Sequence, residues 1–236
     1  MIDLENYWIN LDSKLKVLLE NGIVKLPSLK ILNLDLFAEN INTEVGPLTF
    51  KENTINHKKL LKELEVDKFL TPKLFNISRK FFNYKGDISN QYHIARKVNP
   101  GDRNEQFRAH FDSHIFTIVF PIKIPTAQDN DFAGDLVYFP NIRKLPKNEF
   151  INLLGKTYYK IYASKNGIKK LAKLHAQKVE NFINLEPVIF LGKTTLHTNY
   201  PVSLNCSSYR LTLLSHFFDN SSKYSIGNLL RFLRKR

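Results

Sequence analysis

The chain has 236 residues, 43% hydrophobic and 24% charged, which is typical of a globular domain, and a chain of this length buries roughly 70% of its unfolded surface. Thirty-five Lys and Arg against 22 Asp and Glu give a net charge of +13, which favours an anionic partner: nucleic acid, an acidic membrane surface, or a phosphorylated or carboxylated small molecule. The single Cys206 excludes an internal disulfide, no apolar run approaches the roughly 18 residues of a membrane span, and the first residues lack a secretory signal pattern, so we expect a cytoplasmic protein.

Helices are predicted in the first 85 residues, where we expect them to support the core from outside. Residues 3–22 begin with Asp3 as a plausible N-cap and end at Gly22, with leucines on one face. In residues 57–82 apolar side chains recur at helical spacing on both sides of Pro72, which predicts a break between two helices.

From residue 91 the apolar period becomes that of β-strands. Short runs rich in β-branched and aromatic residues are bounded by Gly, Pro, Asn and Asp, which predicts a β-core. These runs are residues 91–99, 114–124, 134–140, 187–192 and 209–218. Between them, residues 147–184 return to helical spacing, so we expect two inserted helices with Gly167 near their turn.

One predicted strand carries three metal-binding residue types at alternate positions. In FRAHFDSHIF these are His110, Asp112 and His114. Alternate residues of a strand share a face, so His110 and Asp112 could ligate one metal ion, with a third ligand from elsewhere. The best candidate for that ligand is His197 in GKTTLHTNYPV. Two His and one carboxylate form the ligand set of non-haem Fe(II) oxygenases, whereas structural zinc usually requires four ligands that include Cys.

The ordered set of a His-x-Asp pair, a distal His and a later Arg resembles the Fe(II)/2-oxoglutarate-dependent dioxygenase superfamily. The resemblance covers about residues 91–218. AGDLVYFP is similar to the G-G-x-L-x-x-F-P strand of that family, and SSYRLTLLSHF is similar to its closing strand with an Arg-x-Ser/Thr pattern. His197 lies 87 positions after His110, which exceeds the usual gap, and the helical insertion accounts for the excess.

The resemblance implies a single domain, mostly β with flanking helices (α+β), built on a double-stranded β-helix or jelly-roll core. It implies Fe(II), 2-oxoglutarate as cosubstrate and O₂, with hydroxylation of a substrate and release of succinate and CO₂. Residues expected to hold the metal are His110, Asp112 and His197; residues expected to bind 2-oxoglutarate are Arg210, Thr212, Tyr92 and Thr117.

The substrate is not specified by these motifs, because the prolyl-hydroxylase-like and phytanoyl-CoA-hydroxylase-like branches both stay open. We favour a small or medium-sized anionic molecule, since basic residues flank the expected entrance; a peptide or protein substrate is the alternative. Candidate substrate-binding residues are Arg103, Arg108 and His114. Lysines of the insertion could complete a basic rim: Lys165, Lys169, Lys170 and Lys173.

Other interpretations compete with parts of this assignment. The chain could be a non-catalytic jelly-roll module that binds sugar or nucleic acid. Its last residues, 223–236, form a basic amphipathic pattern that could contact an acidic membrane, although packing on the barrel is favoured. The other histidines are expected in the core or on the surface: His57, His93, His175 and His216.

Overall fold

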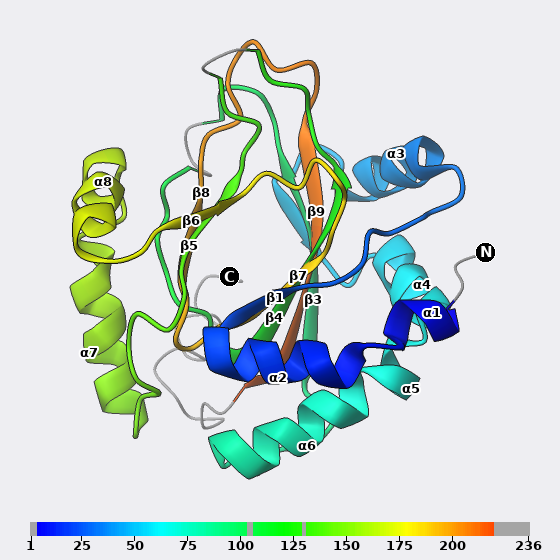
Figure 1. Ribbon diagram of the computed structural model, residues 1–236. Helices are drawn as coiled ribbons and strands as arrows, with labels where there is room; N and C mark the ends of the chain where they lie inside the picture. Colours follow the sequence, from blue (N-terminus) through cyan, green and yellow to red (C-terminus); the bar gives the residue numbers. More distant parts are fainter. Residues whose placement is uncertain (1–3, 103–105, 129–130, 220–236) are drawn as a thin grey trace.

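A computed structural model of the chain describes residues 4–102, 106–128 and 131–219, in which two antiparallel sheets face each other and helices cover their outer sides (Figure 1). Asp3 and the predicted C-terminal helix, residues 223–236, lie outside the described residues. The architecture is therefore mixed α and β, with more helix than the sequence predicted.

The larger sheet has six strands in the order β1-β7-β4-β9-β3-β2. At its centre, β4 pairs with β9 and β9 pairs with β3 along almost their full lengths. The strands are β1 (Ile23–Lys25), β2 (Phe50–Glu52), β3 (Gln91–Val98), β4 (His114–Lys123), β7 (Val188–Leu191) and β9 (Arg210–Asp219). The long strands agree with the predicted runs, and β1 and β2 are short additions at the edges.

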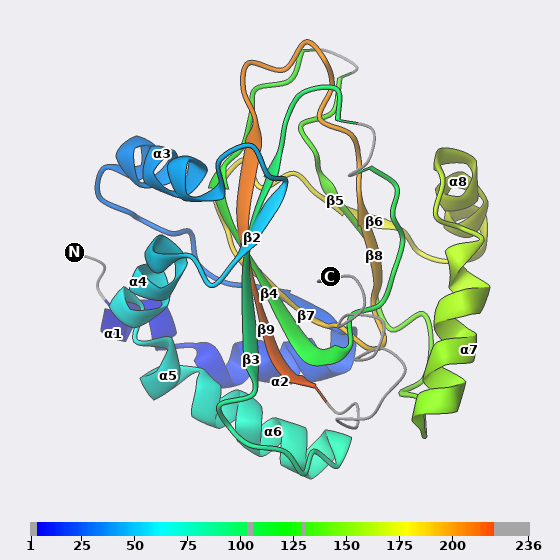
Figure 2. The same cartoon turned by 180° about the vertical axis from the view of Figure 1, so that it is seen from behind.

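The smaller sheet has three strands in the order β6-β5-β8. They are β5 (Leu136–Phe139), β6 (Lys178–Glu180) and β8 (Leu196–Asn199). Figures 1 and 2 show this sheet opposite the larger one. An apolar cluster joins the two sheets, with Val119 and Phe190 from the larger sheet and Leu136 and Tyr138 from the smaller. The space between the sheets is therefore the place where side chains of both can meet.

Six N-terminal helices lie beside the larger sheet, away from the smaller one (Figures 1 and 2). They are α1 (Leu4–Trp8), α2 (Leu11–Asn21), α3 (Leu34–Val45), α4 (Ile55–Glu63), α5 (Val66–Phe69) and α6 (Thr71–Phe82). Gly22 ends α2 in the left-handed conformation, as predicted. Pro72 lies in the first turn of α6, where its missing N–H costs nothing, so the predicted break is confirmed.

The inserted helices α7 (Glu149–Lys160) and α8 (Lys165–Leu174) flank the smaller sheet (Figure 1). Asn148 and Ser164 cap them by accepting hydrogen bonds from backbone N–H groups three residues later. The prediction that helix continues to residue 184 is wrong. The chain turns at His175 and enters β6, because Val179 completes the smaller sheet by pairing with Val137.

The prediction that His110 and Asp112 belong to the strand of His114 is also wrong. Strand β4 begins only at His114, and residues 111–113 are irregular. His110 instead forms an isolated bridge with His197 of the smaller sheet. The chain thus crosses from one sheet toward the other between His110 and His114.

A histidine pair, the buried His57 of α4 and the partly buried His93 of β3, meets where α4 packs on the larger sheet. Ser215 Oγ lies 3.0 Å from His57 Nε2 and 3.1 Å from His93 Nδ1. His57 is fully buried, and its Nδ1 has no hydrogen-bond partner among the described residues. Burial, reinforced by the neighbouring histidines, lowers the pKa of His57 well below its usual value and that of His93 to about 4. Both rings are therefore neutral at pH 7.

This pair predicts loss of stability in acid. Both histidines take up a proton near pH 6.5 in the unfolded chain, whereas in the folded chain the pKa of His93 is about 4 and that of His57 lies well below its usual value. The free energy of unfolding therefore falls as the pH drops below about 6.5. His57→Gln keeps a donor for Ser215 but removes one titrating ring. Urea unfolding at pH 7.5, 5.5 and 4.5 should show a shallower decline in this variant, whereas the exposed His175→Gln should follow the wild type. Equal declines in all three proteins would contradict this origin.

Candidate metal centre

Three potential ligands meet where the chain enters β4 and where β8 begins. One ligand atom from each of His110, Asp112 and His197 lies within 4.8 Å of the other two. His110 Nε2 is 3.6 Å from Asp112 Oδ1, and His197 Nε2 is 3.8 Å from Asp112 Oδ2. Mutual backbone hydrogen bonds of 3.0 and 3.1 Å between His110 and His197 hold the two ligands side by side.

Backbone carbonyl groups orient both imidazoles. His110 Nδ1 lies 2.6 Å from the Arg108 carbonyl oxygen, and His197 Nδ1 lies 3.4 Å from that of Thr195. Each Nδ1 must carry the proton to donate this bond, which leaves the Nε2 lone pairs directed at Asp112. Desolvation lowers the pKa of both histidines, so they are neutral, the form that binds metals. His110 keeps 48% of its side chain exposed, which marks the open side of the cluster.

Asp112 is held as a carboxylate. Burial alone would raise its pKa, but His197, His216, His110 and a hydrogen bond from Thr117 outweigh burial and lower it. Thr117 Oγ1 donates to Asp112 Oδ2 at 2.5 Å and lies 3.0 Å from His216 Nδ1. Thr117 and His216 thus fix one carboxylate oxygen. His216, expected only as a core histidine, is buried here and contacts the cluster.

Gly192 makes room for the carboxylate. A Cβ at this position would lie 2.7 Å from the His114 carbonyl oxygen and 2.8 Å from Asp112 Cβ. The Gly192 carbonyl accepts a hydrogen bond from the Asp112 N–H at 2.9 Å, and its own N–H donates to the Ile115 carbonyl at 2.9 Å. Only glycine allows this close approach of two backbone segments.

Arg210, at the start of β9, is a buried cation with free donor capacity. Only 2% of the residue is exposed, and its Nε has no hydrogen-bond partner among the described residues. With the Asn199 amide oriented by its hydrogen bonds, the Asn199 oxygen accepts from Arg210 Nη1 at 2.9 Å. Burial lowers the pKa of Arg210 to about 9, so the guanidinium is still charged at pH 7. A buried, charged guanidinium with one unpaired donor is suited to a carboxylate ligand.

Gly134 explains how Arg210 fits. At φ +83°, its Cβ position would lie 2.6 Å from Arg210 Cδ and 2.9 Å from Val202 Cγ2. The glycine of the AGDLVYFP motif therefore leaves the space that the Arg210 side chain of the closing strand occupies.

A second arginine, Arg96, was missed by the sequence analysis. Its partner in the register of β3 and β9 is the buried Thr212, so it lies on the face that also carries Arg210. Its charge lowers the pKa of Arg210, after burial, and contributes to lowering those of His110 and His197. The sequence did contain a signal that could have identified Arg96. In a strand, alternate residues share a face, so Arg96 lies on the same face as Tyr92, which was already a candidate. Arg96 and Arg210 thus place positive charge from two neighbouring strands on one face of the larger sheet.

Two expected site residues lie farther along this face. The Tyr92 hydroxyl donates to Glu52 Oε1 at 2.5 Å, and the Tyr92 ring stacks on the His114 ring at 6.1 Å. The His114 ring also lies 5.2 Å from that of His216. His114 is therefore not a member of the ligand cluster but packs beside the residues that support Asp112.

The expected basic entrance is only partly described. Arg108 is exposed and supplies the carbonyl that orients His110, whereas Arg103 lies outside the described residues. The lysines of α8 are exposed. A basic rim over the metal cluster stays a prediction.

The insertion contacts the segment that carries the ligands. Phe111, between His110 and Asp112, packs under the Arg143 guanidinium, whose central carbon is 3.7 Å from the ring centroid. The Tyr159 ring of α7 meets Phe111 edge-on at 5.2 Å, and Lys156 Nζ donates to Ser113 Oγ at 3.2 Å. The helices therefore lie against the metal-binding segment and not only against the flank of the sheet.

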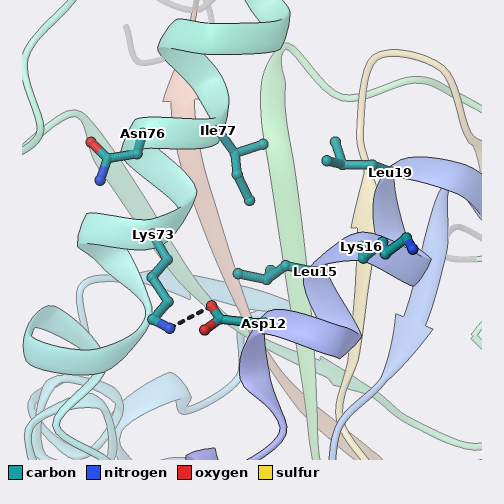
Figure 3. A pocket seen from close by; sticks show the side chains of 7 residues that line it. All are labelled: Asp12, Leu15, Lys16, Leu19, Lys73, Asn76 and Ile77. Atoms are coloured by element: carbon teal, nitrogen blue, oxygen red, sulfur yellow. Dashed lines mark hydrogen bonds and ion pairs between the residues drawn. The ribbon is translucent and has the colours of Figure 1, made fainter.

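A groove between α2 and α6 lies apart from these residues (Figure 3). Leu15, Leu19 and Ile77 line it, and Lys73 forms an ion pair with Asp12 at its rim. It contains no cluster of potential ligands, and we assign it no function.

No family model matches the sequence, and no curated protein matches it. Solved structures do match in three dimensions. A prolyl 4-hydroxylase of Pseudomonas putida is 14% identical, with a TM-score of 0.52 over 89% of this chain and all of that one. A prolyl 4-hydroxylase of Phytophthora capsici is 11% identical, with a TM-score of 0.54 over 99% of this chain and 74% of that one.

The non-haem α-ketoglutarate-dependent carbocyclase SnoK of nogalamycin biosynthesis is also similar, at 11% identity, with a TM-score of 0.52 over 93% of this chain and 90% of that one. The chain has the fold of the 2-oxoglutarate oxygenases. The resemblance read from the sequence is thus confirmed in three dimensions, at identities that show the fold alone. No helix in the described residues is long and apolar enough to cross a membrane.

The tight packing at Gly192 predicts a specific defect. Gly192→Ala should displace Asp112 and weaken Co(II) binding, measured by calorimetry under anaerobic conditions, at least tenfold, as losses of ligand-supporting contacts do. Gly46→Ala controls for a general loss of stability, because φ +63° strains any side chain there although its Cβ would meet nothing closer than 4.0 Å, and Gly46 lies outside the ligand cluster. Equal affinities in the two variants would show that Gly192 does not position the carboxylate.

Proposed function

We propose that this protein is an Fe(II)- and 2-oxoglutarate-dependent oxygenase that hydroxylates an anionic organic substrate, within a single domain whose two sheets form a double-stranded β-helix. The observation that carries the proposal is the joint presence of a two-histidine, one-carboxylate cluster and a buried arginine with an unsatisfied Nε. A structural metal site would need no such arginine, and an anion-binding module would need no such cluster.

The ligand cluster fits a divalent iron ion by its chemistry. The cluster contains two neutral imidazoles and one carboxylate, and a hydrogen bond to a neighbouring group orients each of them. Three ligands of this kind leave coordination positions on the metal open. His110, Asp112 and His197 would hold the ion. Bound there, Fe(II) would supply the redox chemistry that uses O₂ and 2-oxoglutarate to oxidise a C–H bond, with release of succinate and CO₂.

The protein's own residues then have distinct tasks. Arg210 binds the far carboxylate of 2-oxoglutarate through its free Nε and fork geometry, and Thr212, two residues on, presents a hydroxyl on the same face. Thr117 keeps one Asp112 oxygen in place through its hydrogen bond. Phe190, whose ring lies 4.7 Å from His197, and Phe182, near Arg210, exclude water from the inner side.

An anionic substrate is favoured over a peptide by the charge around the cluster. Arg96 adds a second cation on the face of Arg210, and Arg108 is exposed next to the half-exposed His110. Tyr92 and His114, predicted for cosubstrate and substrate, would line the pocket's far end beside His216.

The function predicts uncoupled turnover. With Fe(II), ascorbate and O₂, the protein should release succinate from 2-oxoglutarate, slowly alone and faster with a true substrate, so a screen of carboxylated, phosphorylated, neutral and peptide compounds identifies the substrate class. Asp112→Ala and His197→Ala should abolish succinate release, whereas His114→Ala should still bind iron. Succinate release by Asp112→Ala at the wild-type rate would disprove the proposed centre.

The cosubstrate assignment has its own test. Arg210→Ala leaves a carboxylate unpaired in a buried site, which costs about 2 to 5 kcal/mol, or roughly 30-fold to several thousand-fold in 2-oxoglutarate affinity. Arg210→Lys should recover only part of this loss, because an ammonium lacks the planar fork. Calorimetry on the Co(II)-loaded variants measures it. An unchanged affinity in Arg210→Ala would remove Arg210 from the cosubstrate site.

A further inference from the structure

The inserted helix α7 exposes its apolar face to solvent. Its packed side carries Asn152, Gly155 and Tyr159, and Asn152 binds Arg143 through its side-chain oxygen at 2.8 Å. The opposite face consists of large apolar side chains, which we call the α7 stripe: Phe150, Leu153, Leu154, Tyr158 and Ile161, with exposures of 69, 41, 54, 59 and 67%. Their spacing of three, four and seven residues places them on one side of the helix.

Such a stripe lowers the protein's solubility in water, because it leaves exposed the apolar side that a surface helix normally turns inward. Scattered exposed apolar residues need no explanation, but five on one face of a three-turn helix do. Helix α7 lies at the outer edge of the molecule, beside the smaller sheet (Figures 1 and 2), and the side chains of the stripe are exposed to solvent.

The charge around the stripe is strongly one-sided. Residues 141–178 contain ten Lys and Arg and one acidic residue, so this segment holds nine of the chain's thirteen excess positive charges. Lys160 follows the stripe on α7, and α8 adds four exposed lysines: Lys165, Lys169, Lys170 and Lys173. Within the described residues these four form no ion pair, so their charge is not neutralised by the protein.

We propose that α7 and α8 dock the protein on an anionic lipid surface, with the α7 stripe inserted at the headgroup boundary and the lysines above it paired with lipid phosphates. Apolar burial and electrostatic attraction add together at such a surface, and neither requires a matching partner shape. An acidic protein would also attract the lysines, but nothing in their charge alone would require five exposed apolar side chains.

Docking there would bring the metal-binding segment near the bilayer. Phe111 packs on Tyr159 of α7, and Ser113 receives a hydrogen bond from Lys156. The same helix thus contacts the ligand segment on one side and presents the stripe on the other. This geometry is independent of the metal bound and of the reaction catalysed.

Sedimentation with lipid vesicles tests the proposal on the full chain. Vesicles of equal parts phosphatidylcholine and phosphatidylglycerol should bind the protein, and pure phosphatidylcholine should not. Replacing the four α8 lysines by Ala should weaken binding about a hundredfold or more. The matched control removes four exposed lysines elsewhere, Lys16, Lys30, Lys62 and Lys85, and should bind nearly as the wild type does.

Insertion of the α7 stripe into the bilayer distinguishes the proposed docking from adsorption driven by net charge alone. Phe150→Ser with Leu154→Ser and Ile161→Ser should abolish binding at moderate salt, whereas serine at the exposed Leu32, Leu36 and Ile55 should not. In Leu154→Trp, acyl chains carrying bromine should quench the new fluorophore. They should not quench Leu36→Trp or the native Trp8, which is buried and bonded to the Leu64 carbonyl.

Either of two results would overturn the proposal. Binding to anionic vesicles that is equal in the stripe and control variants would reduce the effect to net charge. No binding to either kind of vesicle would exclude the lipid surface and point to an acidic protein as the partner of α7. Because all substituted side chains are exposed, thermal melts of the variants should coincide with the wild type.

Discussion

The centre depends on one pair of backbone hydrogen bonds, those exchanged between His110 and His197. They join a segment that leads into the larger sheet to a strand of the smaller sheet, although His197 lies 87 positions after His110. Because both bonds are made by the backbone, the ligands' side chains are free to turn their Nε2 atoms toward Asp112. Closing so long a loop is entropically costly, and the apolar contacts between the two sheets compensate for it.

Groups of opposite charge lie near this bridge: one carboxylate in the ligand cluster and two arginines on the adjacent face of the larger sheet. Asp112 is the only carboxylate in the ligand cluster, and it is stabilised by histidines and by the Thr117 hydroxyl. Arg210 and Arg96 add positive charge on the adjacent face, where a dianionic ligand would neutralise it. Asp135 attracts the Arg210 guanidinium, but the Arg210 Nε has no hydrogen-bond partner among the described residues, and a buried donor of this kind is costly unless a ligand completes it.

Much of this arrangement is readable from the sequence. Strands β3, β4, β5, β7 and β9 follow from their composition, and the sequence also predicted His110, Asp112 and His197 as one group, which the structure brings together. The short strands β1, β2 and β6 were not predicted, since three residues carry too little periodicity and form a strand only where a partner strand is present.

The local conformation at the ligands was also not predictable. His110, Asp112 and His114 alternate as a strand would, yet the strand starts at His114, because the backbone at Asp112 binds Gly192 and that at His110 binds His197. These are long-range contacts that no local pattern contains. The orientation of α7 was not predictable either. The helical spacing of the α7 stripe predicted the helix correctly, but it did not show which side of the helix would face the protein.

The position of Phe111 has a consequence for any attempt to change what this protein acts on. An aromatic ring between two ligands is held by Arg143 and Tyr159, both from the region of the inserted helices. Grafting a foreign loop in place of the insertion would therefore not simply alter the entrance. It would remove the support on which the ligand segment rests, so laboratory evolution of new selectivity should keep this aromatic contact fixed and vary the surrounding surface.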